Sequence, residues 1–124
     1  MTSQQKQVLH FMRSFVQDME VVPKIPSDAT VILRRELLRE ETAELLHAIA
    51  SNNIVDIAKE SADLLYVLLG LCNAYGFDLE PVFDEVHRSN MSKVGGRVSA
   101  SGKIMKPSTY TPANVSPMLK SWEG

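Results

Sequence analysis

Apolar side chains recur at helical spacing through the first ninety residues of this 124-residue chain. Near the N-terminus the spacing predicts a helix from Gln4 to about Glu20, through Val8, Phe11, Met12, Phe15 and Met19. Pro23 and Pro26 interrupt the pattern, and Ser27 or Asp28 is expected to cap the next helix.

Two longer helices are predicted at Ile32–Ala50 and Val55–Tyr75, and only residues 51–53 connect them. So short a connection makes them antiparallel neighbours. The second helix is apolar nearly all round between Leu64 and Cys72, so it needs cover on every side, and we expect a second copy of the chain to supply part of it. Gly76 is expected to end this helix. A fourth helix then follows, capped by Asp78 and complete before Gly95.

Carboxylates stand where the two longer helices should bury apolar side chains. Glu41 and Glu44 lie within the apolar stripe of their helix, and Glu40 lies at its edge. Glu60 and Asp63 lie in line with apolar positions of the next helix. Glu41 and Glu44 are three residues apart, as are Glu60 and Asp63, so the two members of each pair share a helix face. Antiparallel packing can turn both pairs toward the space between the helices.

Inward carboxylates need cations, because burying unpaired negative charge is prohibitively costly. Oxygen ligands without a cysteine or a histidine set indicate Mg²⁺, with Mn²⁺ as the alternative ion. Paired ions can bridge a polyphosphate while a carboxylate not fully engaged with metal, Glu41 or Glu44, takes the proton of a water. The competing interpretation is a solvated acidic helix, paired with Arg34, Arg35 and Lys59.

Two histidines allow a second metal interpretation. The segments Glu44-x-x-His47 and Asp84-x-x-His87 imitate the repeated Glu-x-x-His pattern of di-iron bundles. A di-iron site would require both histidines to face the carboxylates. A surface or hydrogen-bonded role is the commoner outcome for each.

Charge is distributed unevenly although the net charge is only −2. Residues 36–63 hold seven acids, whereas residues 86–122 hold none and contain Arg88, Lys93, Arg97, Lys103, Lys106 and Lys120. An acidic centre followed by a basic segment suits a ligand with several phosphates, and the scarcity of aromatics argues against nucleic acid. The length predicts one domain, residues 1–124, with a helical core at about 4–94 and a loop-rich tail at 95–124. With a lone Cys72, no signal-peptide pattern and no bilayer-length apolar run, we expect a cytoplasmic protein.

These motifs resemble those of the MazG-like all-α nucleoside triphosphate pyrophosphohydrolases. The resemblance rests on Glu-Glu-x-x-Glu followed by Glu-x-x-Asp, at Glu40, Glu41, Glu44, Glu60 and Asp63. A second block, residues 85–93 followed by 102–107, is similar to the phosphoribosyl-ATP pyrophosphohydrolase-like branch, which includes enzymes active on dUTP. The resemblance spans roughly residues 33–112.

The resemblance implies an all-α, four-helix-bundle-type domain that forms a homodimer or a dimer of dimers. It implies hydrolysis of the α–β phosphoanhydride of a (deoxy)nucleotide such as dUTP, to monophosphate and pyrophosphate, as a house-cleaning reaction. The five carboxylates would be Mg²⁺ ligands. Asn90, Lys93, Lys103, Lys106 and Tyr110 would contact the nucleotide or its phosphates. A non-catalytic helical interaction module and the di-iron bundle remain the alternatives.

Overall fold

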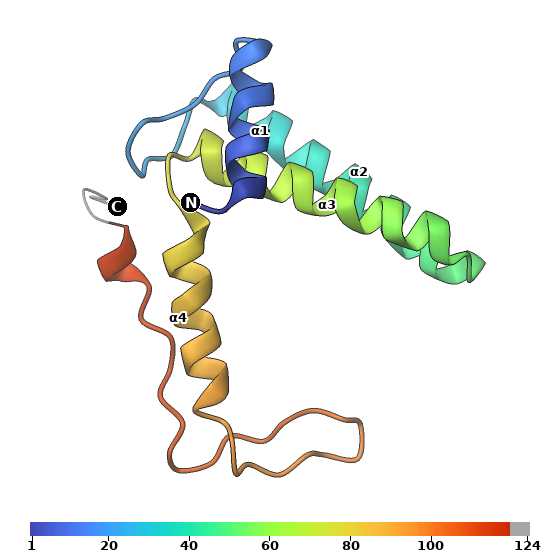
Figure 1. Ribbon diagram of the computed structural model, residues 1–124, viewed down its shortest axis with the longest axis vertical. Coiled ribbons are helices and arrows are strands. Elements are labelled where there is room, and N and C mark those ends of the chain that lie inside the picture. Colours follow the sequence, from blue (N-terminus) through green and yellow to red (C-terminus); the bar gives the residue numbers. More distant parts are fainter. Residues whose placement is uncertain (120–124) are drawn as a thin grey trace. The chain divides into compact units, whose positions relative to one another are not determined.

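A computed structural model describes residues 1–119 (Figure 1). It contains α1 (Ser3–Ser14), α2 (Asp28–Ser51), α3 (Ile54–Ala74), α4 (Leu79–Met91) and the 3-10 turn η1 (Ser116–Met118). No strand is present in this range, which confirms the all-α class. The described chain forms two compact units, residues 1–79 and the residues from 80 onward. The single domain stays a prediction, and Lys120 with the end of the basic tail lies outside the described residues.

The first helix is shorter than its apolar spacing predicted. Thr2 caps α1 by accepting a hydrogen bond from the Gln5 amide, but the helix ends at Ser14 instead of Glu20. Val16 has a φ of 53°, which a β-branched residue rarely adopts, and the Gln17 amide donates to the Met12 carbonyl. The chain therefore turns away from the helix axis at residues 15–17, where no glycine or proline marks the turn.

Helices α2 and α3 form an antiparallel hairpin and pack along one another (Figure 1), as predicted. Ser27 caps α2 by accepting from the Thr30 amide. Asn52 then reverses the chain in the left-handed conformation, and Asn53 caps α3 by accepting from the amides of residues 55 and 56. This tight connection fixes how the facing residues of α2 and α3 are matched.

The core of the first unit lies where α1 crosses the C-terminal half of α3 (Figure 1). Val8, Met12, Leu69 and Ala74 are buried together there. Beside them, the fully buried Gln5 joins α1 to the end of α3 and the start of α4. Its Nε2 donates to Asn73 Oδ1 and to the Phe77 carbonyl, both at 2.9 Å, and its Oε1 accepts from the Leu79 amide at 3.1 Å.

The end of α3 follows the sequence prediction. Gly76 has a φ of +79°, and a Cβ there would lie 2.2 Å from the Val22 carbonyl oxygen, so only glycine fits. Cys72 is buried with a free thiol, as expected, and burial raises the pKa of that thiol to about 11.

Much apolar surface of the first unit stays exposed within one copy of the chain. On α3, Leu65, Tyr66 and Leu68 are exposed, and the ring of Tyr66 meets Phe11 of α1 edge-on, with centroids 5.6 Å apart. This agrees with the expectation that α3 needs further cover, while the homodimer or dimer of dimers stays a prediction. Among residues 1–119, none of the helices combines the length and hydropathy that a bilayer-spanning segment requires.

The second unit consists of α4 and a basic segment that returns along it (Figure 1). Residues 97–105 form a turn closed by an isolated antiparallel bridge between Val98 and Ile104, within the tail that was predicted to be rich in loops. Residues 109–114 then lie against α4 and are held by side-chain hydrogen bonds.

Candidate metal centre and basic segment

Four carboxylates from α2 and α3 converge on one point. Glu41 and Glu44 of α2 meet Glu60 and Asp63 of α3, and one oxygen from each lies within 4.8 Å of the others. The antiparallel hairpin brings the pairs together because each pair shares the face that its helix turns toward its neighbour. The sequence predicted this juxtaposition from residue spacing, and these four side chains can hold a divalent metal ion.

Two carboxylate oxygens of this cluster are buried without any hydrogen-bond partner among the described residues. They are Glu41 Oε2 and Glu60 Oε2. Removal from water, with the neighbouring carboxyl of Glu44 as the second cause, raises the pKa of Glu60. A buried acceptor left unpaired costs about 1–3 kcal/mol, and more when it carries charge. The cluster is therefore short of positive charge.

One ammonium group borders the cluster. Lys59 Nζ lies 2.6 Å from Asp63 Oδ2 and 3.5 Å from Glu60 Oε1, and its pKa is raised, first by the hydrogen bond to Asp63. This is the i,i+4 pair that the solvated-helix interpretation expected. It neutralises one of four carboxylates and leaves the two buried oxygens unpaired, so the cluster could still hold a cation.

The remaining candidates from the sequence lie outside this cluster. Glu40 is exposed and does not join the four carboxylates. Glu40 and Glu41 are 100° apart around the helix, and Glu44 lies between them. Of the two outer residues, Glu41 lies on the side that faces α3, and Glu40 lies on the other side. His47 is exposed, and within the described chain the cluster contains no histidine, which gives the di-iron interpretation no support.

In the second unit, two predicted lysines converge on the predicted tyrosine. Lys93 Nζ lies 5.7 Å and Lys106 Nζ 4.9 Å from the centre of the Tyr110 ring. Asn90 Oδ1 accepts from Lys93 Nζ at 3.1 Å. Lys103 stands apart in the turn, where its backbone bonds to Ser99. Four of the five candidate substrate-binding residues thus share one basic face, suited to anions.

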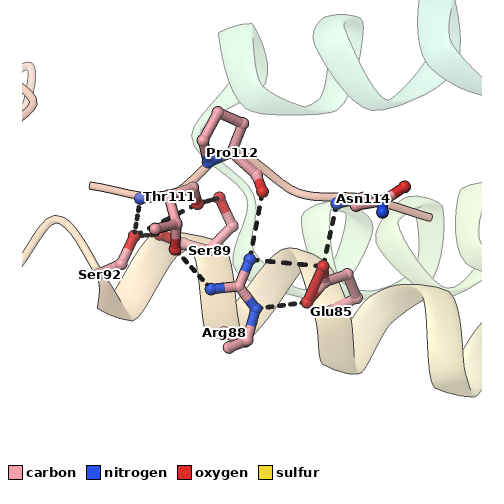
Figure 2. Close-up of polar contacts among 7 residues, drawn as sticks. All are labelled: Glu85, Arg88, Ser89, Ser92, Thr111, Pro112 and Asn114. Carbon is pink, nitrogen blue, oxygen red and sulfur yellow. Dashed lines mark hydrogen bonds and ion pairs between the residues drawn. The ribbon is translucent and has the colours of Figure 1, made fainter. Parts of the chain in front are cut away.

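A polar strap, residues 109–114, is held along α4 by hydrogen bonds on the C-terminal side of Tyr110 (Figure 2). The Arg88 guanidinium donates to Glu85, to the Thr111 hydroxyl and, at 3.2 Å, to the Pro112 carbonyl. Glu85 Oε2 also accepts from the Asn114 amide at 2.9 Å, and the Ser89 hydroxyl donates to the Thr111 carbonyl at 2.9 Å. No motif in the sequence predicted this strap, because its residue types are common in surface loops.

We expect Glu85→Ala to release the strap. The hydrogen bond from Arg88, and next that from the Asn114 amide, lower the pKa of Glu85. The ionised carboxylate therefore stabilises the strap fully at pH values above the ordinary glutamate pKa. This stabilisation is lost as the pH falls through the lowered pKa that Glu85 has in the folded state. Amide hydrogen exchange of Asn114 should accelerate in Glu85→Ala at pH 7. In the wild type, protection relative to the unfolded chain should decrease at low pH.

Asp84→Asn is the matched control, because Asp84 is the exposed neighbour on the same helix. It should leave Asn114 as protected as in the wild type. Equal protection of Asn114 in Glu85→Ala and in the wild type would show that the strap does not depend on this carboxylate.

The all-α fold with a carboxylate cluster between two antiparallel helices defines the class of protein: a helical protein with a group of carboxylates that could bind a metal ion. Residues 8–90 match the family of phosphoribosyl-ATP pyrophosphohydrolases. The chain belongs to this family. The matched range contains all four clustered carboxylates and ends at Asn90, so it covers the metal centre and leaves the segment with Lys106 and Tyr110 outside.

A shorter stretch is similar to a viral protein. Over 51 residues, 41% of this chain, it is 39% identical to an uncharacterized protein of Acanthamoeba polyphaga mimivirus. The aligned region spans about a fifth (20%) of that relative's length. The family membership therefore carries the functional statement: the chain is related to pyrophosphohydrolases that act on nucleotide substrates.

Proposed function

We propose that this protein is a Mg²⁺-dependent nucleoside triphosphate pyrophosphohydrolase. It cleaves the bond between the α and β phosphates of a (deoxy)nucleotide and releases the monophosphate and pyrophosphate. The observation that carries the proposal is the pair of buried, unpartnered oxygens of Glu41 and Glu60, within a group of four carboxylates. The family of pyrophosphohydrolases to which the chain belongs supports the same reaction.

The donor set fits Mg²⁺. It offers carboxylate oxygens only, from two rigid helices, with more negative charge than Lys59 neutralises. Glu41, Glu44, Glu60 and Asp63 would hold the ion, with Glu40 at the outer edge of the site. When bound, Mg²⁺ would supply positive charge for the phosphate oxygens and lower the pKa of a coordinated water.

The carboxylates have a second task in this proposal. One of them accepts a proton from the water whose oxygen forms the new bond to phosphorus. The bridging oxygen leaves with the other product and takes the electron pair of the broken bond. Glu41 is the candidate for proton acceptance because its unpartnered oxygen is buried on the inner face, and Glu44 is the alternative.

The basic face of the second unit is proposed to bind the phosphate chain. Lys93 and Lys106, gathered on Tyr110, provide two positive charges, and Asn90 orients Lys93. Lys103 adds a third charge from the turn that follows Gly102, whose φ is +86°. Point charges of this kind neutralise phosphate oxygens. dUTP is the candidate substrate, and removal of surplus or non-canonical nucleotides is the proposed role.

A product assay tests the function. Purified protein is incubated with a panel of nucleoside triphosphates and diphosphates, with and without Mg²⁺, while pyrophosphate, orthophosphate and monophosphate are measured separately. We expect Mg²⁺-dependent, equimolar pyrophosphate and monophosphate. Release of orthophosphate would show that a different bond is cleaved. No turnover, together with no stabilisation by Mg²⁺ plus a non-hydrolysable nucleotide, would favour the interaction module.

A further inference from the structure

Arg34 is a buried cation with no described acidic partner. Its side chain enters the first unit from α2, and the residue is only 4% exposed. Nη2 donates to Gln17 Oε1 at 2.9 Å, but Gln17 is neutral, and Nε is buried without a partner. Among residues 1–119, no carboxylate forms an ion pair with this guanidinium.

The opposite helix makes room for this side chain. A Cβ at Gly70 would lie 2.7 Å from Arg34 Nη1, so the C-terminal half of α3 has a glycine where the guanidinium packs. A glycine inside a helix costs about 1 kcal/mol relative to alanine. Burial also lowers the pKa of Arg34, which reflects the loss of water around the charge. The uncompensated cation therefore costs stability twice, through the glycine inside α3 and through the desolvation of the guanidinium. A bound anion would offset the second of these costs.

A pocket of about 270 Å³ leads to Arg34. Its walls are Gln17 and Thr30, which are polar, and Phe15, Val16 and Leu33, which are apolar and exposed. Residues 29 and 30 belong to the first turn of α2, where backbone dipoles favour negative charge. The left-handed Val16 forms part of the wall, so the unusual turn after α1 shapes this pocket.

The charge of the pocket restricts its ligand. One guanidinium supplies a single positive charge, and the exposed Asp18 on the pocket wall adds a negative one. A dianionic phosphate would face this carboxylate with only one cation. A carboxylate carries one negative charge and matches the two parallel donors of a guanidinium. The apolar walls suit a hydrocarbon or aromatic body attached to it.

We propose that this pocket binds a small organic acid, with its carboxylate on the Arg34 guanidinium and its apolar body against Phe15, Val16 and Leu33. The site is distinct from the carboxylate cluster. Arg34 and Glu41 share a face of α2 but are two helical turns apart, about 10 Å along the axis. The proposal therefore does not depend on the hydrolase function.

Titration of the full-length chain with benzoate tests the site, with inorganic phosphate and chloride at equal ionic strength as separate arms. We expect saturable changes in the backbone amide NMR signals of Gln17, Thr30 and Leu33 with benzoate, and a melting temperature that rises with its concentration. Phosphate and chloride should leave these three amide signals unchanged. No saturable change with benzoate, or saturation by phosphate alone, would overturn the proposal.

Two variants assign the effect to Arg34. Arg34→Met replaces the charge with an apolar side chain of similar length, so it should melt at or above the wild-type temperature without ligand. Its affinity for benzoate should fall at least about tenfold. Arg35→Met, on the exposed neighbour, should bind as the wild type does. If Arg34→Met does not fold, Arg34→Lys keeps the charge but loses the paired donors, and it should bind less tightly. Unchanged affinity in a folded Arg34 variant would refute the assignment.

Discussion

Glu60→Gln is expected to remove nearly all hydrolysis, with kcat/KM falling at least about 100-fold, while raising the thermal stability of the metal-free protein. The loss of activity follows because Glu60 supplies one of the four converging oxygens and one of the two that are buried without a partner. The gain in stability follows because the metal-free protein must hold mutually repelling carboxylates at short range.

The sign of the pH dependence follows from the pKa of Glu60. Loss of water, with the neighbouring carboxyl of Glu44 as a further cause, raises this pKa in the folded state. Protonation therefore stabilises the fold. The contribution is complete below the ordinary glutamate pKa of about 4.3 and is lost as the pH rises through the raised value. The stability difference between Glu60→Gln and the wild type, both metal-free, should be largest at neutral pH and smaller at pH 5.

Differential scanning calorimetry with and without Mg²⁺ measures both effects. Mg²⁺ should stabilise the wild type, and it should stabilise Glu60→Gln much less. Glu36→Gln is the control, since Glu36 lies on α2 outside the cluster and forms only an exposed pair with Arg39, 3.6 Å away. It should keep full activity and the response to Mg²⁺. A Glu60→Gln protein with wild-type kcat/KM would eliminate the proposed metal centre.

Gln5→Leu should lower the free energy of unfolding by roughly 3–6 kcal/mol. The substitution preserves approximate volume but leaves three groups without their partner. Asn73 Oδ1 is buried, whereas the Phe77 carbonyl and the Leu79 amide are half-buried and their loss lies at the low end of the cost. Each unsatisfied buried group costs about 1–3 kcal/mol. The loss is large relative to the whole stability of a small domain, about 5–15 kcal/mol.

Urea denaturation followed by circular dichroism measures this change, with the midpoint shifting and the slope preserved. Gln4→Leu is the matched control on the same helix, because Gln4 is exposed. It should change stability by no more than about 0.5 kcal/mol. A loss below 1 kcal/mol in Gln5→Leu would mean that water or a rearranged Asn73 replaces the glutamine.

Sequence periodicity predicts the fold correctly where a helix has one apolar face and one polar face. The hairpin of α2 and α3 and the meeting of Glu41 and Glu44 with Glu60 and Asp63 follow from spacing alone. Glu40 shows the limit of the motif, because adjacent residues point 100° apart and only one of them turns toward α3. The spacing of residues along the sequence identifies a helix face, but the packing of α2 against α3 decides which edge of that face is buried.

Features that depend on contacts between distant residues were not predictable. The sequence marks no end for α1 at Ser14, since no glycine or proline stands at the turn. The exposed Val16 is held there by backbone hydrogen bonds to α1, and the Gln17 side chain accepts from Arg34. The competing interpretation placed Arg34 in a solvated ion pair, but the residue is buried. The one sequence signal for this was Gly70 inside the apolar run of residues 64–72. Gln5 gave no signal, because a polar residue on a helix usually faces water.

The close fit between Arg34 and Gly70 has a consequence for how this sequence can diverge. A methyl group at residue 70 would force Nη1 to move and would disturb the neighbouring hydrogen bond from Nη2 to Gln17. We therefore expect Gly70→Ala to be destabilising while the arginine is present. Once residue 34 carries a shorter or apolar side chain, the same alanine would fill vacated space and improve the helix. Among relatives, a larger residue at 70 should therefore coincide with the loss of arginine at 34, and the arginine should have been lost first.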